Sequence, residues 1–361
     1  MSSAEGFARA RAKRVVAFGR RLAAPGDPLG VRARAGLVPT SGLSLEGVDL
    51  ALSEHLETHP APAELDLLLA SVGSAPACHV VLSAQVCTAA LRALALAVAT
   101  APAVVVKPSR RDPVLAALLV EALAADPAFL AAEGTISLSR AREVDPRPGD
   151  ELHVYGSDES IAALTARLAP GVVVRAHGSG LGLAVVSASA SLEEAAFLLA
   201  RDVVPFDQRG CLSPRFALVE GGAPRAEDFA SALDDALASA GRRVPRGLLD
   251  DDDRHALALY AATMEAVGSI TLGPHHAVGF DPAPRALTLP PAARVVHVVP
   301  LEARDAVSLV APLARLVTTL GRAGDGALAE AVSALAPGAR LASLGAMQRP
   351  PLDGPVDRRH G

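Results

Sequence analysis

Apolar and polar positions along most of the chain follow two alternating periods, and these periods predict its elements. Short apolar runs, typical of buried strands, are separated by stretches in which apolar residues recur at helical spacing. The short runs predict strands over residues 79–82, 103–106, 135–138, 151–156, 172–175, 183–186, 216–220 and 294–299. The longer stretches predict helices over residues 87–100, 112–125, 158–168, 192–202, 226–240, 252–267 and 303–320. The first 60 residues contain Pro and Gly breakers and predict a small helical or irregular layer.

Strands that alternate with helices indicate an α/β fold, in which a parallel sheet is covered on both faces. A length of 361 residues suggests two domains. We expect an N-terminal layer and a first domain over residues 1–188, a second domain over 189–340, and a tail over 341–361 that packs back on the body. Ligands of such sheets bind at the carboxyl ends of the strands.

Composition and charge exclude several classes of function. The chain has 34 Lys and Arg against 39 Asp and Glu, a net charge of −5, and its aromatic content is 3%. Both values argue against a nucleic-acid partner, which requires basic surfaces and stacking side chains. The longest apolar stretch, residues 80–106, is interrupted by polar residues and Pro102, so we expect no membrane span.

Cysteine and histidine usage bears on location and on metals. Three cysteines do not form a disulfide framework and fit a reducing compartment, and no signal-peptide core follows the basic N-terminus, so we expect a cytoplasmic protein. His275 and His276 have no further ligands at a recognised spacing, so we expect a loop there and no metal.

The most informative chemistry lies in residues 204–215, which read VPFDQRGCLSPR. Cys211 directly follows Gly210, so it can sit on a tight turn with its sulfur exposed, and Arg209 and Arg215 could favour the thiolate. A thiolate beside backbone N–H donors is the minimum for covalent attack on a carbonyl group. The alternative interpretation is a buried core cysteine.

Two segments of the predicted first domain could bind phosphate or ribose. The run VVVKPS places Lys107 at the end of a strand, followed by Ser109, where a cofactor lies in α/β sheets. A Gly156-Ser157 turn precedes a helix, and a helix start can bind a phosphate through its N–H groups. The alternatives are an ordinary solvated strand end and a plain helix cap by Asp158.

A glycine-rich run, HGSGLG over residues 177–182, differs from the dinucleotide fingerprint G-x-G-x-x-G in the spacing of its glycines. A strand rather than a helix follows it. We therefore expect Gly178 and its neighbours to allow close approach of a ligand or an adjacent strand.

Taken together and in this order, these segments resemble the aldehyde dehydrogenase superfamily, and within it the LuxC-type acyl-CoA reductases. The tail GAMQRPPLD, residues 345–353, is also similar to theirs. The resemblance implies two α/β domains with a Rossmann-like parallel sheet for the cofactor. It also implies that Cys211 is the nucleophile, that Lys107 binds the adenosine ribose, and that Gly156 and Ser157 form the turn at the pyrophosphate.

Two departures from the family pattern affect the chemistry. Aldehyde-oxidising members carry a glutamate base, and the matching position here is His177. Because that base activates water for hydrolysis of the acyl-enzyme, its loss favours reduction; the alternative is that His177 is only a strand-end residue. The family's oxyanion asparagine is matched by Gln85, whose amide has the same donor on a longer stem, with Ser83 as the fallback.

The resemblance also bears on the cofactor. Many NAD-preferring members have a glutamate three residues after the lysine, and here that position is Arg110, with Arg111 beside it. Guanidinium groups bind a 2′-phosphate that a carboxylate would repel, so we expect NADPH to be preferred, with NAD possible. The alternative is that both arginines point into solvent.

The sequence thus predicts NADPH-dependent reduction of an acyl thioester, such as an acyl-CoA, to an aldehyde through a cysteine acyl-enzyme. Two alternatives remain open at this stage. One is a reductase of acyl phosphates similar to γ-glutamyl phosphate reductase, and the other is a non-catalytic binding subunit of the same fold. The expected partner is a small-molecule substrate, with a homo-oligomer possible.

Overall fold

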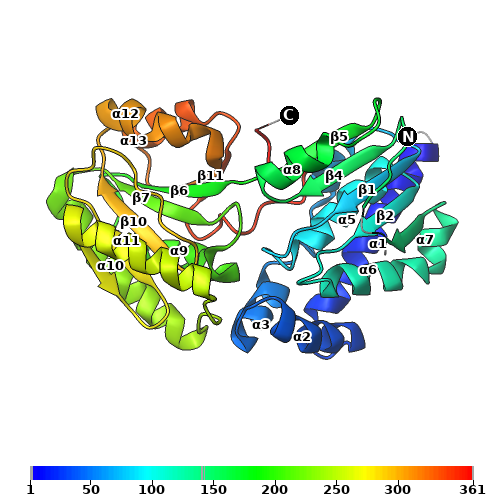
Figure 1. Ribbon diagram of the computed structural model, residues 1–361, viewed down its shortest axis with the longest axis horizontal. Helices are drawn as coiled ribbons and strands as arrows, with labels where there is room; N and C mark the ends of the chain where they lie inside the picture. The colour runs from blue at the N-terminus through cyan, green and yellow to red at the C-terminus, as the bar shows by residue number, and fades with distance from the viewer. Residues whose placement is uncertain (1–2, 140, 142, 360–361) are drawn as a thin grey trace. The chain divides into compact units, whose positions relative to one another are not determined.

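The computed structural model describes residues 3–359 except 140 and 142. The chain forms two compact units, each built around its own β-sheet (Figure 1). Unit 1 comprises Met1–Ser179 and Pro350–Val356, and unit 2 comprises Gly180–Arg349 and Asp357–Gly361.

Unit 1 begins with a helical layer, α1 (Ser3–Ala23), α2 (Pro28–Thr40), α3 (Leu45–Glu54) and α4 (Pro62–Ala70). Asp27 caps α2 and Ser44 caps α3, each by accepting a backbone N–H of the first turn. Helix α1 packs along α5 (Ala89–Thr100), and the buried Arg11 joins the two helices by donating to the carbonyl oxygen of Val98 at 2.7 Å. The expected N-terminal layer is therefore helical.

The sheet of unit 1 has five parallel strands in the order β3-β2-β1-β4-β5. They are β1 (Ala77–Val81), β2 (Ala103–Lys107), β3 (Thr135–Leu138), β4 (Glu151–Tyr155) and β5 (Val173–His177), and the helices that connect them are α5, α6 (Val114–Ala124), α7 (Pro127–Ala131) and α8 (Asp158–Thr165). The strand order reverses between β1 and β4. That reversal is the switch point at which doubly wound sheets bind ligands, outside the carboxyl ends of the strands.

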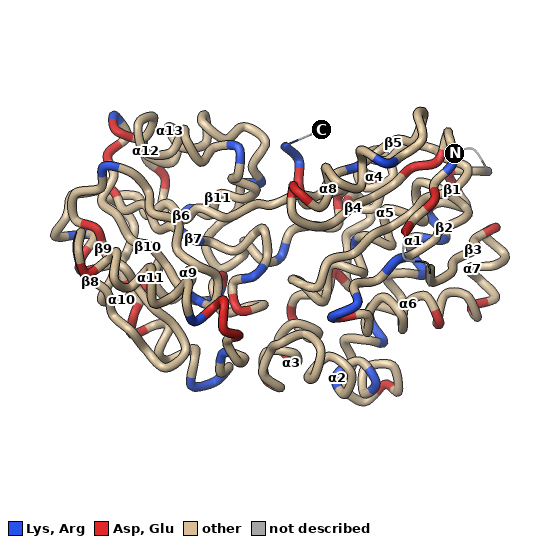
Figure 2. The backbone as a smooth tube through the Cα atoms, viewed as in Figure 1, with Lys and Arg blue, Asp and Glu red and all other residues tan. Residues whose placement is uncertain are grey.

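The sheet of unit 2 has seven strands in the order β12-β11-β6-β7-β10-β9-β8. They are β6 (Leu181–Val186), β7 (Pro214–Val219), β8 (Ser269–Leu272), β9 (Ala277–Phe280), β10 (Val295–Pro300), β11 (Val317–Ala323) and β12 (Arg340–Ser343). Strand β8 runs antiparallel to β9, and the other pairs of this sheet that the structure describes are parallel. Figure 2 shows β6 and β10 without charged residues, as expected for strands buried on both faces.

The helices of unit 2 include α9 (Leu192–Val203), α10 (Gly222–Arg243), α11 (Asp251–Val267), α12 (Ala306–Val310) and α13 (Ala327–Leu335). Ser191 caps α9 and Asp250 caps α11 through their side-chain oxygens. The eight predicted strands are all present within a few residues of their expected bounds, which confirms the α/β class.

The predicted helix over residues 303–320 is wrong. The segment contains two short 3₁₀ turns, Ala303–Asp305 and Ala311–Leu316, separated by α12, and then strand β11. Strand β11 lies between β6 and β12, and its first five residues are buried. A strand buried on both faces gives an apolar run whose period cannot be told from that of a buried helix. The pattern also did not predict β8, β9 and β12.

The border between the compact units lies at Ser179–Gly180, earlier than the expected border after residue 188. The physical reason is that β6 pairs with β7 and β11, so it belongs to the second sheet. The segment 341–361 is also divided, since Pro350–Val356 belongs to unit 1 and the residues on either side of it to unit 2.

Both parts of this tail are tied down by buried charged side chains. In unit 1, Arg92 of α5 donates to three tail carbonyl groups, those of Pro350, Pro351 and Gly354. In unit 2, the carboxylate of Asp202 accepts the backbone N–H groups of Gly345 and Met347, at 2.6 and 2.9 Å. Because a buried polar group that loses its partner is destabilising, these bonds fix the path of the tail.

Among the helices described, none combines the length and the apolar character that a membrane crossing requires.

The core of unit 2 contains one ionisable side chain that stays neutral. His297 of β10 is fully buried, and its Nδ1 lies within hydrogen-bond distance of the Tyr260 hydroxyl oxygen, at 2.8 Å. Its Nε2 is buried without a hydrogen-bond partner among the described residues. Burial lowers the pKa of His297 to about 4, because the apolar surroundings disfavour the charged ring.

We predict that His297 makes unit 2 sensitive to acid. The unfolded chain takes up the histidine proton near pH 6.5 and the folded chain only near pH 4, so stability falls as pH drops through that window, by up to about 3 kcal/mol. Urea unfolding at pH 7.5 and 5.0 measures the loss. The variant His297→Gln keeps an acceptor for Tyr260 and is expected to lose less stability across the same window; an equal loss would contradict the assignment.

Candidate active site

Cys211 is the most accessible of the three cysteines. It is half-buried at the amino end of β7, whereas Cys78 and Cys87 are buried. Burial raises the pKa of the Cys87 thiol to about 12 and raises the pKa of the Cys78 thiol still further, so neither forms a thiolate at neutral pH. Cys211 is therefore the only cysteine with the access that a nucleophile needs.

The backbone around Cys211 is packed closely against the first residues of β6 and β11. The hydroxyl of Thr318 donates to the carbonyl oxygen of Cys211. A Cβ atom at Gly180 would lie 2.4 Å from the Thr318 side chain and 3.3 Å from the Cβ of Cys211. Gly180 thus allows the close approach of an adjacent strand that the glycine-rich run predicts, since Thr318 of β11 packs directly against it.

The turn that leads to Cys211 has an unusual backbone. Phe206, Asp207 and Gln208 all lie in the left-handed region, with φ of 56°, 50° and 63°, and the facing residues Ala293 and Arg294 have φ of 80° and 65°. Non-glycine residues in this region each cost on the order of 1 kcal/mol or more, so surrounding contacts must hold them.

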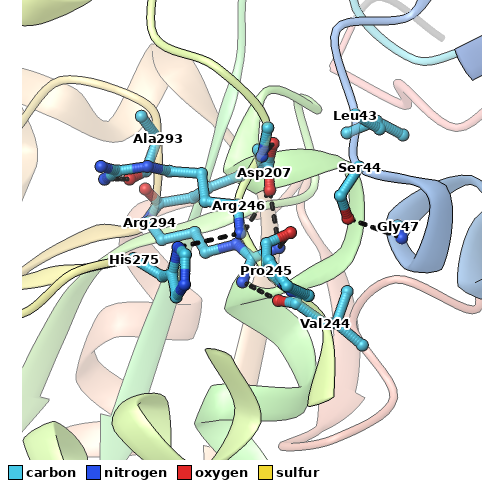
Figure 3. Close-up of polar contacts among 12 residues, drawn as sticks. Leu43, Ser44, Gly47, Asp207, Val244, Pro245, Arg246, His275, Ala293 and Arg294 are labelled. Atoms are coloured by element: carbon cyan, nitrogen blue, oxygen red, sulfur yellow. Dashed lines mark hydrogen bonds and ion pairs between the residues drawn. The ribbon is translucent and has the colours of Figure 1, made fainter. Parts of the chain in front are cut away.

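The contacts that hold this turn are a buried ion pair and a buried amide. Arg294 donates to Asp207 from both Nε, at 2.9 Å, and Nη2, at 2.7 Å, and each residue is only 1% exposed (Figure 3). The second oxygen of Asp207 accepts the N–H of Gly247. Gln208 donates to the carbonyl oxygens of Pro214 and Val295 and accepts the N–H of Val295.

Arg294 also donates to the carbonyl oxygen of Val244 at 2.6 Å, and Arg246 donates to that of Ala293 (Figure 3). The two left-handed segments are therefore fastened to each other and to the loop after α10. We name the ion pair between Asp207 and Arg294 the latch.

The two arginines that flank Cys211 in sequence have other partners. Arg209 forms an ion pair with Asp253 at 2.9 Å, and Arg215 donates to the carbonyl oxygen of Pro290. Burial lowers the pKa of Arg215 to about 10. The structure thus assigns both guanidinium groups to interactions with the rest of unit 2.

In unit 1, the residues expected to bind a cofactor lie at the carboxyl edge of the sheet. Lys107 is the last residue of β2, and Gly156 and Ser157 follow β4 directly at the switch point. Ser157 caps α8 by accepting the N–H of Ser160 at 3.2 Å. The sequence offered Asp158 as the cap of this helix, and the structure shows that the cap is Ser157.

The neighbouring residues of this edge have defined positions. Ser109 accepts the backbone N–H of Arg111, and the side chain of Arg110 is exposed. At Gly178 a Cβ atom would lie 2.1 Å from Oδ1 of Asp158, so a larger residue there would displace this carboxylate. That close approach is again to the chain itself.

The two remaining candidates also belong to unit 1. Gln85 is exposed in the loop between β1 and α5. His177 is the last residue of β5, and its Nε2 lies 3.4 Å from Nδ1 of His153. The carboxyl ends of four strands thus bring Lys107, Gly156, Ser157, Gln85 and His177 to one sheet edge, whereas Cys211 belongs to unit 2.

The histidine pair at 275–276 has partners within unit 2. His275 accepts the N–H of Arg246, and His276 lies 2.8 Å from the carboxylate of Asp234. Across the part of the chain that the structure describes, no group of three or more His, Cys, Asp or Glu side chains could hold a metal ion.

The fold is that of the aldehyde dehydrogenases. The chain is similar to a NAD-dependent benzaldehyde dehydrogenase from Corynebacterium glutamicum, with a TM-score of 0.68, 16% identity, and coverage of 96% of this chain and 80% of that one. It is also similar to a propionaldehyde dehydrogenase from the fucose-utilisation microcompartment of Clostridium phytofermentans, with a TM-score of 0.61, 12% identity, and coverage of 96% and 84%.

A third similar structure is a propionaldehyde dehydrogenase from Rhodopseudomonas palustris with bound propionyl-CoA, with a TM-score of 0.63, 14% identity, and coverage of 96% and 82%. The family model for acyl-CoA reductase (LuxC) matches residues 70–354, and the chain belongs to this family. It is accordingly an oxidoreductase acting on the aldehyde group, of the class that reduces acyl-CoA to aldehyde. No curated protein sequence matches the chain.

Several residues that shape the site carry no signal in the predicted motifs. Arg294 is 87 residues from its partner Asp207, so no spacing rule connects them. Glu151 and His153 stand two apart in a predicted strand, and this spacing alone places them on one face of the sheet. The two-residue spacing is thus a signal in the sequence that these two side chains are neighbours.

We predict that breaking the latch disturbs Cys211 before it unfolds the protein. Asp207→Asn or Arg294→Gln alone leaves one buried charge unpaired, at a cost of about 3–5 kcal/mol in the free energy of unfolding, and lets the strained turn relax. The rate of iodoacetamide labelling at Cys211 should fall about tenfold. Urea unfolding and mass-spectrometric labelling measure the two effects.

The double variant Asp207→Asn/Arg294→Gln is the matched control, since it removes both charges. It should recover part of the lost stability without recovering the labelling rate. Single variants that unfold at the wild-type urea concentration would show that the latch does not hold the turn.

Proposed function

We propose that the protein reduces an acyl thioester to an aldehyde with NADPH through a thioester on Cys211. The observation that carries the proposal is the half-buried thiol at the start of β7, on a strained turn held by the latch. Membership of the acyl-CoA reductase family supports the substrate class.

In the proposed reaction, the Cys211 thiolate attacks the thioester carbonyl and forms a tetrahedral intermediate. The backbone N–H of Cys211 and the amide of Gln85 are the proposed donors to its oxyanion. Collapse expels the thiol of CoA and leaves the acyl group on Cys211. His177 stands where aldehyde-oxidising members carry the glutamate base, and we propose that loss of this carboxylate slows hydrolysis of the thioester.

The carboxyl edge of the unit 1 sheet is the proposed site for a dinucleotide. Lys107 supplies a cation at the end of β2, and the residues that follow β4 begin a capped helix at the switch point. At Gly156 a Cβ atom would meet only an ordinary contact, so this turn leaves room for a close ligand. A nicotinamide cofactor, when bound, supplies the hydride that reduces the acyl group to the aldehyde.

The preference for NADPH is proposed from charge. Arg110 is exposed and follows Lys107 by three residues, with Arg111 beside it, and the carboxylate that would repel a 2′-phosphate is absent from that position. Guanidinium groups bind phosphate through charge-assisted, bidentate hydrogen bonds.

Replacing Cys211 tests the nucleophile. Cys211→Ala should lower aldehyde formation from acyl-CoA by roughly 10³-fold or more while leaving the affinity for NADPH near that of the wild type. Consumption of NADPH measures the first effect and fluorescence titration the second. The buried thiol of Cys87 provides the control, since Cys87→Ala should retain activity.

Retained turnover in Cys211→Ala would remove the mechanism. Acyl phosphates are assayed in parallel, because turnover of these alone would assign the protein to the acyl-phosphate reductases. A chain that binds acyl-CoA and turns over neither substrate would be a binding subunit.

Replacing Arg110 tests the cofactor preference. Arg110→Glu should raise the KM for NADPH relative to that for NADH by about 10–100-fold, because a charge-assisted contact worth about 1.5–3 kcal/mol is replaced by repulsion. Arg167→Glu, which changes an exposed arginine of the same unit, should leave the ratio unchanged. An unchanged ratio in Arg110→Glu would show that this position does not read the 2′-phosphate.

A further inference from the structure

A pocket of unit 1 is lined by residues of α1, of α4 and of the turn that precedes α4. Its volume is about 350 Å³, which falls within the range of small-molecule sites, about 300–1,000 Å³. Three cations and four apolar residues line it. All seven precede residue 70, where the match to the acyl-CoA reductase family begins, so family membership assigns no role to this pocket.

The most buried part of the lining is apolar. Val16 of α1 and Leu65 of α4 are only 3% and 6% exposed. Pro60, before α4, and Pro62, at its first position, complete the apolar lining. Aliphatic side chains and proline rings offer no hydrogen bonds, so a ligand of this pocket needs an apolar part that displaces water from them.

The cations of the pocket share one face of α1. Arg9, Lys13 and Arg20 are spaced by four and seven residues, and this spacing brings side chains to the same side of a helix as Val16. The described residues that line the pocket include no carboxylate. A ligand therefore meets positive charge beside an apolar surface.

The three cations differ in their partners. Arg9 forms an ion pair with Asp66 of α4, and Arg20 donates to the carbonyl oxygen of Thr58 at 2.8 Å. Lys13 is exposed and has no hydrogen-bond or ion-pair partner in the part of the chain that the structure describes. The Nε of Arg9 is buried and also lacks an acceptor among those residues. Because buried donors are nearly always satisfied, this unsatisfied donor indicates that a further group completes the pocket.

The remaining cations of α1 are fully engaged outside the pocket. Arg14 forms an ion pair with Asp126, and Arg21 forms one with Asp27. Arg11 is buried and donates to two backbone carbonyl groups. Along α1, the cations that lack a carboxylate partner among the described residues and are not buried are therefore two residues of the pocket, Lys13 and Arg20.

We propose that this pocket binds a small organic anion with an alkyl body, the chemistry shared by a medium-chain carboxylate and an alkyl phosphate. The anionic head binds Lys13, which stands between Arg9 and Arg20 along the helix, and the alkyl chain lies over Val16 and Leu65. Binding is non-covalent, so no bond of the ligand breaks. The pocket is separate from the proposed chemistry at Cys211, because every lining residue belongs to unit 1.

Isothermal titration of the full-length protein tests both halves of the ligand. The probes are decanoate, decyl phosphate, inorganic phosphate and decanol. At least one of the two alkyl anions should bind roughly tenfold or more tightly than inorganic phosphate and decanol, because only the alkyl anions use both the cations and the apolar lining. The tighter of the two identifies the head group. Inorganic phosphate or decanol that binds as tightly as both alkyl anions would overturn the proposal.

Reversing the charge of Lys13 locates the site. Lys13→Glu should weaken binding of the tighter alkyl anion by about 10–100-fold, because a charge-assisted contact is replaced by repulsion. Arg32→Glu is the matched control: it makes the same change of charge at an exposed arginine of α2 that does not line the pocket, and it should leave the affinity unchanged. Thermal melts confirm that both variants are folded.

A photoreactive diazirine analogue of the tighter alkyl anion tests the location without any substitution. Mass spectrometry should find the label within residues 9–20 and 60–65, and an excess of the parent anion should suppress it. Labelling confined to other peptides, including those that contain Cys211, would overturn the assignment and leave the proposed function standing. An affinity that is unchanged in Lys13→Glu would do the same.

Discussion

The buried ion pair between Asp207 and Arg294 is the constraint on which the site in unit 2 depends. Phe206, Asp207 and Gln208, which shortly precede Cys211, have left-handed backbone conformations that side chains disfavour. The ion pair of Asp207 and the hydrogen bonds of the Gln208 amide hold this turn in place. Strain of this kind is retained where geometry matters more than stability. Here the strained turn precedes Cys211, whose half-buried thiol lies at the amino end of β7.

Unit 1 is organised by a different principle, the topology of its parallel sheet. The strand order reverses between β1 and β4, and the parallel strands end at the same edge of the sheet. Residues that are distant in sequence, such as Gln85 and Gly156, therefore lie at one edge through topology alone. Glu151, His153 and His177 are the exception, because hydrogen bonds join them along β4 and across to β5. Polar side-chain contacts therefore order this edge, whereas the turn before Cys211 is defined by its strained backbone.

Much of this was visible in the sequence because the strands of both sheets are short and, apart from β8, parallel to their described neighbours. Runs such as Ala103–Lys107 are short, β-branched and bounded by breakers, and they fold as strands as predicted. Strand β11 escaped prediction because burial on both faces removes the alternation that distinguishes a strand. The latch escaped because its two residues meet only through tertiary structure, while Cys211 itself was marked by its glycine and by the family motif.

The tail segment Pro350–Val356, which belongs to unit 1, links the stability of α5 to residues far along the chain. Arg92 of α5 forms an ion pair with Glu57, and its other N–H groups donate to carbonyl groups up to 262 residues later. Removing residues 350–354 would leave Arg92 with its ion pair to Glu57 but with buried N–H groups that have lost their carbonyl acceptors. A change in residues 350–354 would thus be felt in unit 1, and the helix that it affects first is α5, which carries Arg92.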